Sequence, residues 1–299
     1  MKKLFSYSIF SILLLVIFSL ESKGQSAKME EGYSFGLRST DPVVMDVTRT
    51  DERITFNAEN KSYFPYSLTI KFSSLQNLLP RIFERTEILH PGNNRLFELG
   101  VVDKTQSTQY DYSVSYSMKL SDDPDLSFPY LIPIGAGKTV QFQSFKKENS
   151  EVFIINQFMM NYGDTVFAVR KGIVTALPGD DSRVDRVIKA SSLEILHKDG
   201  TLAIYRGLDP AKNKLHRGQL VFPGQTLGNM EKNGTLILQV LANQGPSMLK
   251  GLDIFYSDKN GEVISSKKVK NSEVFYPVEI VKKEMTDREI KKYEKGKLF

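Results

Sequence analysis

Cysteine is absent from all 299 residues of this chain. Its absence excludes disulfides, thiolate metal sites and cysteine nucleophiles together. A lipid-modified N-terminal cysteine is excluded as well, because no cysteine follows the apolar run near the start of the chain. If the protein is exported, its hydrophobic core therefore has to stabilise it without covalent cross-links.

Histidine is scarce, since the chain contains only His90, His197 and His216. No Gly-x-Ser-x-Gly motif is present, so a Ser/His/Asp hydrolase has little material to build on. We expect His197 and His216 to be turn or surface residues rather than metal ligands. The acidic clusters at 122–125 and 180–181 include or adjoin Pro or Gly and indicate turns. A carboxylate pair for glycoside hydrolysis could come from anywhere in the fold, and nothing favours one.

Only one long hydrophobic run is present, and it opens the chain. Lys2 and Lys3 precede an apolar stretch over residues 4–20, and a Ser-Lys-Gly segment follows at 22–24. This pattern predicts a signal peptide over residues 1–24 and export to the periplasm or the extracellular space. The alternative is an uncleaved anchor, because the run is nearly long enough to cross a bilayer. No later stretch is apolar enough to span a membrane.

Charge is nearly balanced, with 40 basic against 35 acidic residues and a net charge of +5. Such a surplus suits contact with acidic cell-surface polymers, but its even spread does not identify a partner. We expect no nucleic-acid partner and no membrane span after signal cleavage. The oligomeric state is left open.

The segment Gly135-Ala136-Gly137-Lys138-Thr139 resembles the end of a phosphate-binding loop. The full motif requires a glycine five residues before Gly137, where Ile132 stands, and a helix after the lysine. Residues 140–143 continue instead in strand-like alternation. The segment therefore predicts a hairpin turn, and we expect no cofactor.

The first half of the chain alternates apolar and polar residues in short stretches. These stretches are residues 43–48, 53–58, 66–72, 110–116 and 140–143. A period of two with one apolar face predicts antiparallel strands packed on a core, and turn residues separate the stretches. We predict an immunoglobulin-like β-sandwich over residues 25–145. Residues 74–82 fit either a short helix or an extended connection.

A charged break over residues 146–150 predicts the boundary of a second, β-rich domain that spans residues 146–299. The sequence Asn260-Gly261 between two apolar stretches predicts a hairpin. Near the C-terminus, Thr286 and Glu289 form a capping-box pattern, and Gly296 would end the helix. The charge of this helix predicts a solvated surface element. The fold class is thus all-β, or mainly β, with a short C-terminal helix.

A series of glycine turns and short apolar strands runs through the second region. In order, the segments are GDTVFA (163–168), KGIV (171–174), LEILHKDG (193–200) running on to Tyr205, RGQLVFPGQTLG (217–228) and GTLILQV (234–240). In order and spacing they resemble the lysostaphin-type zinc metallopeptidases, also called duplicated-hybrid-motif proteins, which are peptidoglycan endopeptidases. The resemblance covers roughly residues 150–242 and implies a β-sheet domain with a peptide-holding groove.

Active members of that family carry a His and, four residues on, an Asp before the first of these turns, whose usual Thr is Asp164 here. These two residues and the second His of a late His-x-His pair hold the zinc. The first His of that pair and a His two residues beyond a Tyr act on water or the oxyanion. The corresponding positions in this chain are Phe153, Gln157, Gly207, Thr235 and Ile237.

No shift of the alignment recovers the missing ligands. The chain has no histidine between His90 and His197 and none after His216. In the last segment, Leu236, Leu238 and Val240 fit the inward apolar set, which leaves the His-x-His positions to Thr235 and Ile237. The resemblance therefore implies a catalytically degenerate member with no catalytic residue and no metal ligand of the family type.

The resemblance implies a non-catalytic cell-envelope protein that binds a peptidoglycan peptide or a protein partner, because zinc-free relatives activate other wall hydrolases. The candidate binding residues are Gln157, Asn161, Tyr205, Arg206, Thr235 and Gln239. One alternative is an active zinc metallopeptidase with an unorthodox site. Another is an envelope scaffold whose N-terminal sandwich makes the contacts.

Overall fold

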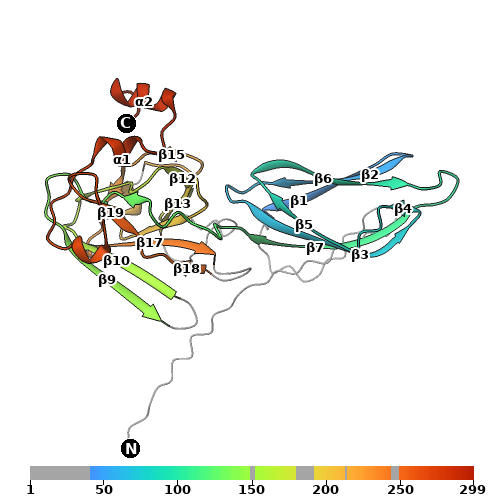
Figure 1. Cartoon of the computed structure of the whole chain (residues 1–299), viewed down its shortest axis with the longest axis horizontal. Helices are drawn as coiled ribbons and strands as arrows, with labels where there is room; N and C mark the ends of the chain where they lie inside the picture. The colour runs from blue at the N-terminus through green and yellow to red at the C-terminus, as the bar shows by residue number, and fades with distance from the viewer. Residues whose placement is uncertain (1–40, 149–151, 180–191, 213, 244–248) are drawn as a thin grey trace, which may run out of the picture.

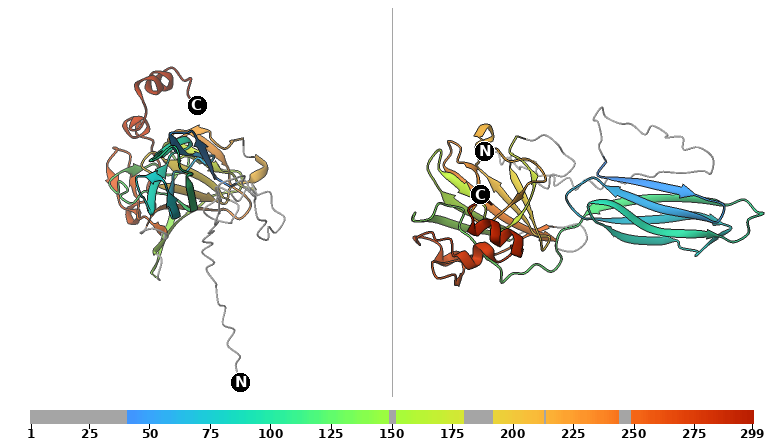
Figure 2. Two further views of the ribbon diagram at one scale, coloured as in Figure 1. Left: turned by 90° about the vertical axis from the view of Figure 1, so that its right-hand side faces the viewer. Right: turned by 90° about the horizontal axis from the view of Figure 1, so that it is seen from above.

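The computed structural model describes residues 41–148, 152–179, 192–212, 214–243 and 249–299. The predicted signal peptide over residues 1–24 lies outside the described residues. The described chain is mainly β, as predicted, with several antiparallel sheets and short helices near its end. A β-sandwich and a second β body lie end to end (Figures 1 and 2). No helix in the described segments is long and apolar enough to cross a membrane.

The N-terminal sandwich consists of two sheets over one core. The first sheet contains, in order, β1 (Val43–Arg49), β2 (Arg53–Asn60), β6 (Gly92–Val101) and β4 (Leu78–Leu79). The second contains, in order, β5 (Glu84–Leu89), β3 (Tyr66–Gln76) and β7 (Gln109–Met118). Their inward aromatic residues meet at the centre, where Phe56 stacks on Phe97 and contacts Phe72 and Tyr112 edge-on. The predicted alternation thus produces a two-sheet sandwich.

Residues 74–82, left open between a helix and an extended connection, are extended. β3 continues to Gln76, and β4 follows at Leu78–Leu79. Asn77 between them adopts φ 58°, a left-handed conformation that asparagine tolerates. The side chain of Asn77 donates to the carbonyls of Asp103 and Gln106 at 2.7 and 3.0 Å. A corner between two strands therefore replaces the possible helix.

The second body is built on a long antiparallel sheet. Its strands are, in order, β15 (Leu220–Val221), β12 (Gly172–Ala176), β13 (Leu193–His197), β14 (Leu202–Arg206), β17 (Thr235–Asn243), β10 (Val152–Met159) and β9 (Gln141–Glu148), with β18 (Leu249–Gly251) also paired to β17. One face of this sheet covers a hydrophobic core that includes Leu238, Tyr205 and Phe158. We call the opposite face the outer face.

The predicted domain boundary at 145/146 is wrong. β9 runs through it and pairs with β10 along eight residue pairs. Phe142, assigned by its sequence pattern to the first domain, packs in the second core beside Phe158. The charged residues after Phe145 stand near the end of a β-hairpin rather than in a linker. The connection between the two bodies lies earlier, after Leu120, where the chain leaves the sandwich core.

Smaller elements close the core on its other side. They are a two-stranded sheet of β11 (Thr165–Phe167) and β16 (Thr226–Asn229), a sheet of β20 (Val263–Ile264), β19 (Phe255–Ser257) and β8 (Pro129–Tyr130), the 3-10 turns η1 (Pro210–Lys212) and η2 (Ser266–Lys268), and the helices α1 (Val278–Lys282) and α2 (Asp287–Glu294). The predicted hairpin at Asn260-Gly261 is confirmed as the β19–β20 turn. The predicted capping box of Thr286 and Glu289 is confirmed at the start of α2.

The sandwich packs against one end of the outer face. Leu202, Ile204 and Leu241 of the long sheet belong to the same hydrophobic cluster as the sandwich core. Backbone hydrogen bonds also connect the segment after the sandwich to the long sheet. The Ser121 amide donates to the Gly200 carbonyl at 2.9 Å, and the Asn243 amide donates to the Ser121 carbonyl at 2.8 Å. This end of the outer face is therefore occupied, and the other end of the same strands is left for a site.

Candidate functional site on the outer face

Three neighbouring strands bring four of the five degenerate positions together. Gln157 on β10 lies directly opposite Ile237 on β17, and Ile237 also lies opposite Arg206 at the end of β14. Gly207 follows Arg206 and approaches Thr235 so closely that a Cβ there would stand 2.4 Å from the Thr235 carbonyl oxygen. Residues that are separated by up to 80 positions in the sequence thus meet at one place.

The alternation along β17 fixes the face on which these residues lie. Leu236, Leu238 and Val240 are fully buried in the core, as predicted from their apolar period. Successive strand residues point to opposite faces, so Thr235, Ile237 and Gln239 belong to the outer face. The fifth position, Phe153, pairs through its backbone with Lys147 at the far part of β10.

The residues at the meeting point do not fit a zinc ion. Zinc sites in proteins use imidazole, thiolate or carboxylate donors. Gln157, Gly207, Thr235 and Ile237 supply an amide, no side chain, a hydroxyl and an alkyl group. Within the described part of the chain, no three His, Cys, Asp or Glu side chains gather in a group that could hold a metal ion. We therefore derive no chemical step through a metal at this place.

The backbone conformation and the close packing at position 207 admit only a glycine. Its backbone has φ +98°, a region that residues with a Cβ rarely adopt. A Cβ would also contact the Met230 methyl group at 3.3 Å. A histidine at this position, as the active enzymes carry, would require both the backbone and β17 to move. In this chain the main chain itself therefore leaves no room for a side chain at position 207.

Tyr205 has to be removed from the predicted binding residues. The side chain is fully buried in the core, on the face opposite to Gln239. Its hydroxyl oxygen accepts a hydrogen bond from the Val169 amide at 3.0 Å. Burial raises the pKa of the Tyr205 hydroxyl, so it stays neutral and structural. The tyrosine of the sequence pattern holds the sheet to the turn at Val169 and cannot contact a ligand on the outer face.

Arg206 and Gln239 lie on the outer face and contact each other. The Nη2 atom of Arg206 donates to Oε1 of Gln239 at 2.8 Å. Gln239 is 2% exposed, which holds its amide in place. Desolvation lowers the pKa of the Arg206 guanidinium, and the charge of Glu194 partly raises it again. Two of the predicted binding residues therefore form a polar contact with each other beside Ile237.

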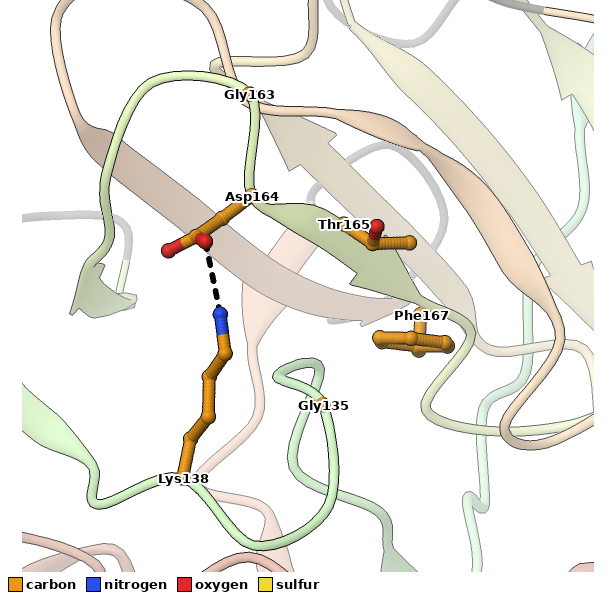
Figure 3. Close-up of a pocket in the computed structure, with 6 residues that line it drawn as sticks. All are labelled: Gly135, Lys138, Gly163, Asp164, Thr165 and Phe167. Atoms are coloured by element: carbon orange, nitrogen blue, oxygen red, sulfur yellow. Dashed lines mark hydrogen bonds and ion pairs between the residues drawn. The ribbon is translucent and has the colours of Figure 1, made fainter.

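Asn161 stands in a turn at the end of β10 rather than on the outer face. Its amide donates to Oδ2 of Asp164 at 2.9 Å, and Lys138 forms an ion pair with Oδ1 of Asp164 at 2.8 Å (Figure 3). The hydrogen bond from Lys138, together with that from the Asn161 amide, lowers the pKa of the Asp164 carboxyl. Asp164, which replaces the usual Thr, thus fastens the loop at Lys138 to the turn.

A small cavity of about 210 Å³ lies beside this ion pair. Figure 3 shows its lining, which comprises Gly135, Lys138, Gly163, Asp164, Thr165 and Phe167. None of the five degenerate positions lines it. The glycine-rich segment that resembles a phosphate-binding loop is therefore a turn that contributes one wall of this cavity.

His197 contradicts its prediction as a surface or turn residue. It is 2% exposed at the end of β13, with Nδ1 at 2.8 Å from the Lys171 carbonyl and its ring against that of Tyr130. Burial lowers the pKa of His197 to about 4. His216 is exposed, as predicted, and His90 is exposed as well. His197 follows Leu193 and Ile195 of the core at a period of two along β13, and this alternation could have signalled its burial.

A buried ion cluster next to His197 was not predicted from the sequence. Arg170 donates through Nη2 and Nε to Glu284 at 2.7 and 3.1 Å and through Nη1 to Asp199 at 2.8 Å. The Arg170 guanidinium also lies 3.8 Å from the ring centre of Phe128. The cluster ties the segment between α1 and α2 to the turn after β13, so its role is structural.

No protein-family profile and no curated protein matches the sequence. Among solved structures, Helicobacter pylori Csd3 in an orthorhombic crystal aligns at 14% identity over 86% of this chain and 78% of that chain, with a TM-score of 0.29. Csd3 in a hexagonal crystal aligns at 10% identity over 85% and 79%, with a TM-score of 0.26. At these TM-scores the likeness carries no argument about this chain.

Proposed function

We propose that this protein is an exported cell-envelope protein whose peptidase-like domain binds a peptidoglycan peptide or a protein partner without cleaving it. The observation that carries the proposal is the meeting of Gln157, Gly207, Thr235 and Ile237 on one patch of the outer face. These are four of the five positions that the resemblance to lysostaphin-type peptidases marks, and the fifth, Phe153, lies apart on β10. The residue types there supply no donor set for a zinc-bound water.

The chemistry of the patch favours binding over hydrolysis. Peptide hydrolysis by this route requires a metal that lowers the pKa of a water and a base that takes its proton. The side chains on the patch are instead amide, hydroxyl, alkyl and guanidinium groups. Such groups form hydrogen bonds and apolar contacts to an extended peptide, as peptide-binding sheets do. The patch can hold a ligand in the absence of a catalytic group.

The N-terminal sandwich supports a regulatory form of the same proposal. It is fixed to the far end of the outer face through Leu202, Ile204 and Leu241 and through the bonds of Ser121. A partner hydrolase could contact both the sandwich and the patch, which would make the protein a regulator of that hydrolase. Pull-down with the full mature chain and with Ile237→Glu separates this form from a scaffold in which the sandwich makes all contacts.

Co-sedimentation of the mature chain with purified peptidoglycan tests the proposal. Ile237→Glu places a charge at the centre of the patch, and we expect it to weaken binding at least about tenfold. Val44→Glu, at an exposed aliphatic position on β1, is the matched control and should bind as the parent protein does. Circular dichroism confirms that both variants fold. Equal binding by all three proteins contradicts the proposal, and release of soluble fragments by the parent protein would favour an unorthodox peptidase.

A further inference from the structure

Arg170 and Arg206 both lie in the second body and both have desolvated guanidinium groups. They differ in how many of their N–H donors form hydrogen bonds. Arg170 has three of its nitrogens bonded, to both oxygens of Glu284, to Asp199 and to the Tyr130 hydroxyl. Burial lowers the pKa of Arg170, but its hydrogen bonds and acidic neighbours raise it overall. This arginine is fully compensated by its own chain.

Arg206 is not compensated in this way. Its only hydrogen bond within the described residues is the one from Nη2 to Oε1 of Gln239. The Nε atom is enclosed and has no hydrogen-bond partner there. Desolvation is the largest influence on the Arg206 pKa and lowers it, and the nearby charge of Glu194 raises it by less. A buried donor without a partner is costly, so this guanidinium has hydrogen-bonding capacity that the described part of its own chain does not use.

The surroundings orient the guanidinium for recognition. Gln239 is buried and presents its oxygen to Nη2, which fixes one edge of the planar group. Ile237 lies opposite Arg206 on β17 and Gln157 lies opposite Ile237 on β10, so an apolar and an amide side chain continue the patch away from the charge. A fixed guanidinium beside a row of strand residues matches a carboxylate at one point of an extended peptide.

We propose that Arg206, positioned by Gln239, is the carboxylate-binding residue of the outer face and recognises a carboxylate of a short extended peptide. The inference rests on the proposed binding function and names the chemistry that the patch selects. A C-terminal α-carboxylate and an acidic side chain share this chemistry. In this role Arg206 is a specificity residue, and Gln239 is the residue that positions it.

The experiment uses three short peptides and the mature protein. One is acetyl-Ala-Ala-Ala with a free carboxylate, the second is its C-terminal amide, and the third is acetyl-Ala-Glu-Ala amide. Their dissociation constants are measured by nuclear magnetic resonance titration, and the Nε–H signal lost in Arg206→Lys reports on the guanidinium itself. We expect at least one carboxylate peptide to bind about ten- to a hundredfold more tightly than the neutral amide and to shift that signal.

Variants separate charge from geometry. Arg206→Gln should remove the preference for the carboxylate, and Arg206→Lys should retain only part of it, because a lysine lacks the planar fork. Gln239→Leu should weaken the preference by loosening the guanidinium. Arg81→Gln removes an equal charge at an exposed position on the sandwich and serves as the control that should change nothing.

The outcomes distinguish this inference from the function on which it rests. Equal affinity for carboxylate and amide peptides, or an unchanged preference in Arg206→Gln, overturns the inference. The same holds if no peptide binds while the parent protein still sediments with peptidoglycan, and in that case the proposed function stands. If the parent protein does not sediment with peptidoglycan, that result would instead contradict the proposed function. Affinity for the carboxylate peptide should also fall as salt is added.

Discussion

Gln157 lies directly opposite Ile237 across the β10–β17 pair, and the sequence resemblance to lysostaphin-type peptidases aligns these two positions with zinc ligands. An amide and a branched alkyl side chain thus face the same direction from adjacent strands. A single substitution could restore at most one donor, whereas a zinc site needs at least three. The side chains that could donate to a zinc ion are therefore absent from three neighbouring strands. At Gly207 the backbone also leaves no room for a donor side chain.

Gly207→Ala should be much more destabilising than a glycine substitution at a comparable φ. Gly207 and Gly92 have φ values of +98° and +92°, but a Cβ at Gly92 meets nothing within 4 Å. We expect Gly92→Ala to lower the free energy of unfolding by about 1–2 kcal/mol and Gly207→Ala by about 3 kcal/mol or more. Urea denaturation of the two variants measures the difference. Similar losses would mean that β17 yields easily and that a histidine could be accommodated.

Removing Arg170 should leave two nearly buried carboxylates without their cation. Arg170→Leu leaves Glu284 and Asp199 nearly buried without their cation, which should cost about 3–5 kcal/mol of unfolding free energy. Arg95→Leu removes an exposed ion pair with Glu98 and should cost less than about 1 kcal/mol. Denaturant titration of both variants provides the comparison. If the two losses are alike, the buried cluster is not a stabilising feature of the joint between α1 and α2.

His197 should make stability depend on pH in the acidic range. Its folded-state pKa of about 4 lies below the ordinary value of 6.5, so the unfolded chain binds a proton first as the pH falls. Stability is fully present above pH 6.5 and should fall by up to about 1.4 kcal/mol per pH unit between 6.5 and 4. His197→Gln retains a donor for the Lys171 carbonyl and should flatten that slope. An identical slope in the variant assigns the pH dependence to other groups.

Much of the fold follows from local patterns. Alternation predicted the sandwich strands, Asn260-Gly261 predicted a hairpin, and Thr286 with Glu289 predicted the helix start, because each depends on neighbouring residues alone. The boundary at 145/146 failed for a non-local reason. β9 carries charges near its end but pairs with β10, and no local signal tells a charged hairpin end from a linker.

The site shows the same division. The spacing of the family motif was sufficient to bring Gln157, Thr235 and Ile237 to one patch, because register in paired strands follows from the alternation. It was not sufficient for Tyr205, whose side chain faces the core, since a one-residue difference in position reverses the face. The burial of His197 and Arg170 depends on tertiary contacts. The Arg170 partner Glu284 lies more than 100 residues away along the chain, so no local stretch of sequence contains both.

The central claim is that the patch binds and does not cleave, and zinc loading tests it most directly. The purified mature protein is dialysed against excess zinc and then against zinc-free buffer, its metal content is measured by mass spectrometry, and the same sample is incubated with peptidoglycan. We predict substoichiometric zinc, retention of the protein on the peptidoglycan and no release of soluble fragments. One zinc per chain together with fragment release that a chelator stops would contradict the account.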